Sequence, residues 1–167
     1  MQLPTQITKP TTTSPKNLIL YGPPKVGKTS ITSILPRSLL IDLEDGSNYV
    51  EAMKVTPTNL RDVDDLAKLI QDAKYPYTFI IVDTIDKMED WCETEATELY
   101  RKHPIGRSFQ GQSVLELPNG SGYYWLRVAF VKYYNLIRKL APYVIFLGHV
   151  RDKLLNFDGK EVSVASL

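Results

Sequence analysis

The residues best suited to chemistry lie in one short stretch near the N-terminus of the chain. The stretch consists of Gly22, Pro23, Pro24, Lys25, Val26, Gly27, Lys28, Thr29 and Ser30. It fits the pattern G-x-x-x-x-G-K-[ST], in which backbone N–H groups surround phosphate oxygens and the following helix adds its positive N-terminal dipole. The pattern predicts that Lys28 reaches the β- and γ-phosphates of a nucleotide and that the Thr29 hydroxyl ligates Mg²⁺.

The sequence on both sides of this stretch fits the same interpretation. Residues 17–21 are mostly apolar and predict a short strand, and residues 30–35 predict the first turns of a helix. A phosphate-binding loop needs this order, because the strand and the helix together fix where the curled backbone points. A chance match of glycine and lysine would not require such flanks.

Two carboxylates follow apolar runs and are candidates for metal binding and for catalysis. Asp83 closes the run 78–82, where an acid would hold Mg²⁺ through water opposite Thr29; the plainer alternative is a cap on the next helix. Glu44 ends a second run that begins at Ser38, and a strand-end carboxylate there would polarise an attacking water. Asp42 alternates with Glu44 on one strand face, so either residue could be the base; we favour Glu44.

His149 ends a further apolar run, 143–148. If that strand lies beside the strand of residues 17–21, the imidazole would lie over the γ-phosphate and distinguish ATP from ADP. A hydrogen-bonded structural histidine is the alternative. Asp86, three residues after Asp83, is interpreted as a helix-start acid.

Alternating strands and helices position these residues. Apolar positions recur at helical spacing from Leu60, after a proposed N-cap at Thr58, and along 84–102 and 123–140. Together with the continuous apolar strands, this predicts an α/β fold with a mostly parallel central sheet and helices on both faces. Ligands bind such sheets at the carboxyl ends of the strands, where all the candidate residues fall.

Composition restricts the class of protein. At 167 residues, 43% of them hydrophobic and 23% charged, the chain suits one soluble domain, and no apolar run approaches the ~20 residues that a membrane helix needs. Cys92 is the single cysteine, which excludes a disulfide framework and a cysteine metal site and favours the cytosol. We expect residues 1–15 to form a flexible arm and residues 16–167 to form the core.

Charge is distributed unevenly along the chain, and the excess of basic residues lies in residues 101–167. That part holds 10 Lys/Arg and 4 Asp/Glu, which favours an anionic partner, although a solvated basic face would look the same. Residues 104–122 predict a long loop, and 153–157 with 160–164 predict a hairpin. Phe109 is a weak candidate for base stacking. The candidate phosphate contacts are Arg101, Lys102, Arg107, Arg151 and Lys153.

With these motifs in place, the chain resembles the RecA-type recombinase ATPases, and more narrowly the phage-encoded AAA-24 group, some of which anneal single-stranded DNA. The resemblance covers about residues 16–155 and rests on LLIDLEDGS, FIIVDTIDKM and VIFLGHVRDK. It implies a catalytic role for Glu44 and Lys28, metal binding by Thr29 and Asp83, and a sensor at His149. It also implies ATP and Mg²⁺, single-stranded DNA in recombination or annealing, a ring or filament of identical subunits, and the bacterial cytoplasm if the chain is phage-encoded.

The chain departs from the family pattern in two ways. The sensor is His149, where these families commonly have Gln, and the chain stops at Leu167, where such folds usually add strands. A truncated piece or a shorter natural variant would explain the second departure. Two alternative functions are a small-molecule kinase and a non-catalytic scaffold that assembles on nucleotide.

Overall fold

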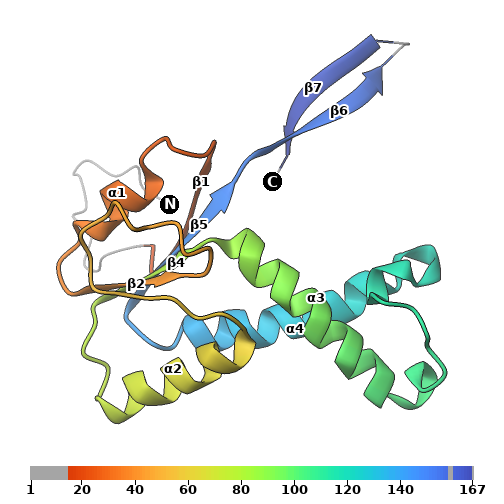
Figure 1. The fold of residues 1–167 in the computed structure, drawn as a ribbon, viewed down its shortest axis with the longest axis horizontal. Coiled ribbons are helices and arrows are strands. Elements are labelled where there is room, and N and C mark those ends of the chain that lie inside the picture. Colours follow the sequence, from red (N-terminus) through yellow and green to blue (C-terminus); the bar gives the residue numbers. More distant parts are fainter. Residues whose placement is uncertain (1–14, 158–159, 167) are drawn as a thin grey trace, which may run out of the picture.

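The computed structural model describes residues 15–157 and 160–166, with side chains described for 15–150. Its centre is a parallel five-stranded sheet in the order β1-β5-β4-β2-β3 (Figure 1). The strands are β1 (Asn17–Gly22), β2 (Ser38–Asp42), β3 (Lys54–Val55), β4 (Phe79–Asp83) and β5 (Tyr143–His149). The predicted α/β class with a parallel sheet is confirmed; the short strand β3 was not predicted.

Helices cover both faces of the sheet. Helix α1 (Lys28–Ser33) contacts β1, β2 and β4 on one face. The opposite face carries α2 (Leu60–Asp72), α3 (Ile85–Lys102) and α4 (Gly122–Ile137), and the larger hydrophobic core lies there. Among the described residues, no helix is both long and apolar enough to cross a membrane.

Strand burial follows sheet order. Every residue of β2 is buried, because β2 lies inside the sheet between β4 and the short β3. Strand β1 is an edge strand of the described sheet, and its Leu18, Ile19 and Tyr21 are 42%, 54% and 53% exposed. An apolar run in the sequence therefore did not distinguish a covered strand from an edge strand.

The predicted long loop is an ordered segment packed on α3 and α4. It contains three 3₁₀ turns, η1 (Pro104–Gly106), η2 (Val114–Glu116) and η3 (Pro118–Gly120). Val114 is fully buried and its N–H donates to Thr97 Oγ1 at 3.1 Å. The chain approaches so closely here that a Cβ on Gly122 would lie 1.8 Å from the Val114 carbonyl oxygen. The glycines thus permit packing of the segment rather than freedom of movement.

Several helix details differ from the sequence prediction. Asn59, not Thr58, is the N-cap of α2, and Thr58 donates to Asp62 instead. Helix α4 ends at Ile137, three residues earlier than predicted. Its buried face is formed by Gly122, Leu126, Ala129, Tyr133 and Ile137, whereas Trp125 and Leu136 are only partly buried.

A two-stranded antiparallel sheet follows β5. It consists of β6 (Arg151–Phe157) and β7 (Lys160–Ser166), which form the predicted hairpin with slightly longer strands, and it extends away from the central sheet (Figure 1). The proposed N-terminal arm, apart from its last residue, lies outside the described residues.

Candidate functional site

The phosphate-binding stretch forms a tight turn between β1 and α1. Gly27, the residue before α1, has φ 91°, in the left-handed region that favours glycine. A Cβ on Gly27 would meet no atom within 4 Å, so the backbone angle, rather than space, explains glycine here. Lys25 also has a positive φ, 63°, although it carries a side chain.

Lys28 is folded back over its own loop. Its Nζ donates to the carbonyl oxygens of Gly22 and Pro23, each at 2.9 Å, and the residue is buried. A buried ammonium needs such partners because desolvation is costly for a charge. The arrangement keeps the cation at the mouth of the loop, where phosphate oxygens can replace the two carbonyl groups.

Thr29 and Asp83 lie side by side although 54 positions separate them in the sequence. Thr29 Oγ1 donates to Asp83 Oδ2 at 2.6 Å. Burial raises the pKa of Asp83 above its usual range despite this hydrogen bond, and the nearby Asp42 and Glu44 carboxylates raise it further. A cation placed here would relieve that repulsion, and hydroxyl and carboxylate oxygens are ligands that Mg²⁺ prefers, so the pair fits the predicted metal role.

The two candidate bases have different environments. Asp42 is buried at the end of β2 and accepts hydrogen bonds from the N–H groups of Glu44, Gly46 and Ser47 and from the Ser47 hydroxyl. Burial alone would raise the pKa of Asp42, but these hydrogen bonds outweigh it and lower the pKa. Asp42 therefore builds the turn and has no spare position for a water.

Glu44 lies in that turn, two residues beyond the strand that was predicted to contain it. It is exposed, and its Oε1 accepts a hydrogen bond from Thr84 Oγ1 at 2.7 Å. Strand pairing sets Asp42 opposite Asp83, so the turn carries Glu44 close to the end of β4.

His149 lies at the end of β5, directly beside the strand that leads into the phosphate-binding loop. The pairing of β1 with β5 sets His149 opposite Gly22, and Val150 N donates to the Gly22 carbonyl at 3.3 Å. The predicted neighbouring of these two strands is confirmed. The backbone N–H of His149 donates to Asp86 Oδ2 at 2.8 Å, so Asp86 also contacts β5 in addition to lying in the first turn of α3.

One cavity of about 220 Å³ unites these residues. The residues that line it are Pro24, Lys25, Gly27, Lys28, Thr29, Asp42, Glu44, Gly46, Tyr49, Asp83 and His149. Sequence reasoning missed Tyr49, which is 73% exposed at this cavity, as well as the hydrogen bonds made by Thr84 and Asp86. An aromatic residue shortly after the turn at 45–47 was the available signal for Tyr49.

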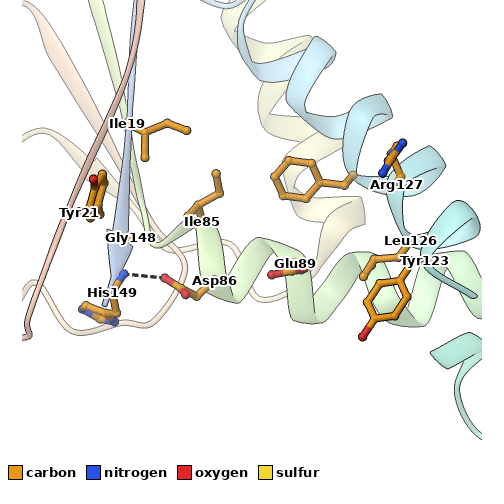
Figure 2. Close-up of a pocket in the computed structure, with 11 residues that line it drawn as sticks. Ile19, Tyr21, Ile85, Asp86, Glu89, Tyr123, Leu126, Arg127, Gly148 and His149 are labelled. Carbon is orange, nitrogen blue, oxygen red and sulfur yellow. Dashed lines mark hydrogen bonds between the residues drawn. The ribbon is translucent and has the colours of Figure 1, made fainter. Parts of the chain in front are cut away.

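A second cavity, of about 410 Å³, lies on the α3 and α4 side of β1 and β5 (Figure 2). Its lining is mostly apolar and includes Ile19, Tyr21 and Phe130, with the carboxylates of Asp86 and Glu89. His149 lines both cavities. The last residue of β5 is therefore common to both cavities.

The proposed nucleic-acid contacts are not gathered in one place. Arg101, Lys102 and Arg107 lie at the C-terminal end of α3, about 27 Å from its start at 1.5 Å per residue. Arg101 is engaged with Glu98 and with the Gly111 carbonyl. Arg151 and Lys153 belong to β6, which begins two residues after His149, and their side chains lie outside those described.

Phe109 and Cys92 are both packed against other side chains. Phe109 is half-buried and packs against Tyr100 in a T-shaped arrangement with ring centroids 5.3 Å apart, so its ring is part of the packing on α3. Cys92 is buried among apolar residues, and burial raises the pKa of its thiol to about 12. A thiol with that pKa is not a nucleophile at neutral pH.

Comparison with known proteins agrees with this geometry. A family model described as AAA domain (AAA_24) matches residues 14–165. A search of curated proteins gave no match. The matched range includes the phosphate-binding loop, Glu44, Asp83 and His149, and the family is one of P-loop ATPases of the AAA type. The chain therefore belongs to the AAA_24 family of P-loop ATPase domains.

Proposed function

We propose that this protein hydrolyses ATP with Mg²⁺ and that the ATP state binds single-stranded DNA, in phage-type recombination or annealing in the bacterial cytoplasm. The observation that carries the first part is the convergence of Lys28, Thr29, Glu44, Asp83 and His149 on one cavity. These side chains come from four different segments. The cavity lining as a whole holds three carboxylates (Asp42, Glu44 and Asp83) and two lysines (Lys25 and Lys28), a concentration of charge that packing alone does not require. The second part depends on the resemblance and on the basic residues of 101–167.

Each residue has a distinct task in this mechanism. Lys28 leaves its two carbonyl partners and neutralises charge on the β- and γ-phosphates. Thr29 and Asp83 would hold Mg²⁺, which neutralises the phosphate charge that develops during transfer. Glu44, exposed on its turn and held by Thr84, orients a water and accepts its proton.

Glu44→Gln tests the chemistry separately from binding. The amide keeps the size and the acceptor for Thr84 but removes the base, so turnover should fall by about 10²–10⁴-fold while ATP still binds. Glu51→Gln, the same change on an exposed acid nearby, is the matched control. Turnover is measured with and without single-stranded DNA. Unchanged turnover in Glu44→Gln would contradict the assigned base, and ATP binding without turnover in the unaltered protein would favour the scaffold.

A further inference from the structure

We propose that the start of α3 positions the two residues assigned to the γ-phosphate, Glu44 and His149. Thr84, the N-cap, holds Glu44, and Asp86, in the first turn, holds His149. The two are positioning residues, because neither is placed to touch the reacting atoms. This role rests on the proposed ATP hydrolysis, because it concerns how Glu44 and His149 are held in place for that reaction.

Thr84 connects the proposed base to the start of α3. It is fully buried; its hydroxyl donates to Glu44 Oε1 at 2.7 Å and accepts from the Lys87 N–H at 3.3 Å. A hydroxyl has one proton to donate, and in the described structure that proton goes to Glu44. An exposed glutamate on a turn would otherwise sample several rotamers. The hydrogen bond restricts Glu44 to the rotamers that keep it at the end of β4.

Asp86 performs the corresponding task on the other side. Its Oδ2 accepts the backbone N–H of His149 at 2.8 Å, as the dashed line in Figure 2 shows. The contact requires a close approach between α3 and β5, and Gly148 permits it, since a Cβ there would lie 3.3 Å from Ile85 Cγ2 and 3.8 Å from Asp86 Oδ2. This hydrogen bond fixes the backbone at the end of β5 and hence the point from which the His149 side chain extends.

The sheet order explains how one turn serves both residues. Strand β4 lies between β2 and β5 in the sheet. Helix α3 follows β4 directly and therefore starts between the carboxyl ends of β2 and β5. Asp83 lies next to Thr29, Thr84 reaches the turn after β2, and Asp86 reaches the end of β5. The proposed metal ligand Asp83 and the positioning residues Thr84 and Asp86 therefore lie within four consecutive positions of the sequence.

The Thr84 half is tested by a double-mutant cycle with Glu44. Thr84→Val keeps the shape and loses the hydrogen bond, so kcat should fall about 5–10-fold, the equivalent of one hydrogen bond, while KM and the equilibrium Kd for ATP stay unchanged. Thr84→Ser should keep the wild-type kcat. In the Glu44→Gln background, Thr84→Val should have no further effect, because the two residues act as a unit.

The outcomes distinguish this inference from the proposed function. If Glu44→Gln itself leaves turnover unchanged, the proposed base fails. If Glu44→Gln is inactive and Thr84→Val retains the full kcat, or if the two effects multiply, the positioning role fails. Thermal unfolding of each variant is measured alongside, and if Thr84→Val does not fold, Thr84→Ala replaces it in the same cycle.

The Asp86 half is tested by nucleotide binding without turnover. Asp86→Ala should reduce the ratio of ADP Kd to ATP Kd to that of His149→Ala, whereas Asp86→Asn, which keeps an acceptor oxygen, should retain the wild-type ratio. Glu89→Gln is the matched control, since Glu89 lies one turn further along α3 and lines the same cavity. An unchanged ratio in Asp86→Ala, with His149→Ala reduced, would overturn the assignment.

Discussion

Both ends of helix α3 carry polar residues, but these residues contact different parts of the molecule. At the N-terminal end, Thr84 and Asp86 make hydrogen bonds to residues of the turn after β2 and of β5, at the cavity that holds Lys28. At the C-terminal end, Arg101 donates to Glu98 and to the Gly111 carbonyl and so ties down the segment that returns to α4. The N-terminal end arranges groups around the cavity lined by Lys28, whereas the C-terminal end mainly makes contacts that hold the following segment in place.

The difference shows that a basic residue in the sequence is not by itself a binding residue. Arg101 was a candidate phosphate contact, but in the described structure its guanidinium already has two partners. The ordered packing around Val114 likewise gives the glycine-rich segment a structural reason to exist. If the two ends are as separate in function as they are in space, substitutions at the distal end should leave nucleotide binding unchanged.

Lys28→Ala should have the largest effect. Removing the ammonium leaves the phosphate charges without the cation at the loop mouth, so tight ATP binding should be abolished. Lys68→Ala, on an exposed ion pair of α2, is the control and should bind ATP normally. Isothermal titration with ATP measures both. ATP binding by Lys28→Ala at wild-type affinity would show that the loop is not the phosphate site.

Val114→Ala should have its effect on folding alone. Removing two buried methyl groups should cost about 2–3 kcal/mol of unfolding free energy, whereas Val131→Ala, the same change at a 43% exposed position on α4, should be near neutral. Urea unfolding measures the cost. The ATP Kd should not change; a weaker Kd in folded Val114→Ala would show that the distal end communicates with the nucleotide site.

Asp42→Asn should have a moderate effect that depends on pH. The folded-state pKa of Asp42 is lowered, so its contribution is present above the unfolded pKa of about 3.9 and is lost as the pH falls through the folded value. At pH 7 the amide, which cannot accept all four hydrogen bonds, should cost about 1–2 kcal/mol. The difference from wild type should shrink below about pH 4. A difference that stays constant down to pH 2 would contradict the role.

From the sequence it was possible to predict which residues lie close together, but not the hydrogen bonds that each of them makes. Parallel strands share their carboxyl ends, and Thr29, Asp83 and His149 each end or follow a predicted strand, so the sequence placed them at one edge of the sheet without the strand order being known. The choice between Asp42 and Glu44 depended on β2 ending at Asp42 and on a turn that wraps around its carboxylate. That turn is local, since its donors lie two to five residues after Asp42, but the Asp-Gly-Ser turn signal at 45–47 did not show that the Asp42 carboxylate is the group at its centre.

Three features of the fold could not be predicted from local sequence patterns. Helix α4 has large apolar side chains on its exposed side as well as its buried side, such as Tyr123 and Val131, so its pattern does not define which face is buried. The exposure of β1 follows from its position at the edge of the sheet, which a local apolar run does not encode. The ordering of 104–122 likewise depends on contacts with α3, such as Val114 with Thr97.

The smallest predicted effect concerns Arg107, an exposed cation at the distal end. In the described part of the chain Arg107 makes no ion pair or side-chain hydrogen bond, unlike Arg101 nearby. If the distal end contacts single-stranded DNA, Arg107→Ala should weaken affinity a few-fold and reduce the slope of log affinity against log salt by about 0.7, the value for one phosphate contact. Arg101→Ala should instead lower the unfolding temperature.

The comparison between these two arginines decides what the distal end does. DNA affinity is measured for both variants at several salt concentrations with ATP bound, using Arg61→Ala on α2 as the control. A changed slope in Arg107→Ala alone would mean that DNA spans from the nucleotide edge to the far end of α3, about 27 Å away by helix rise. An unchanged slope would show that Arg107 makes no phosphate contact and would leave Arg151 and Lys153, on the strand that begins two residues after His149, as candidates for the next variants.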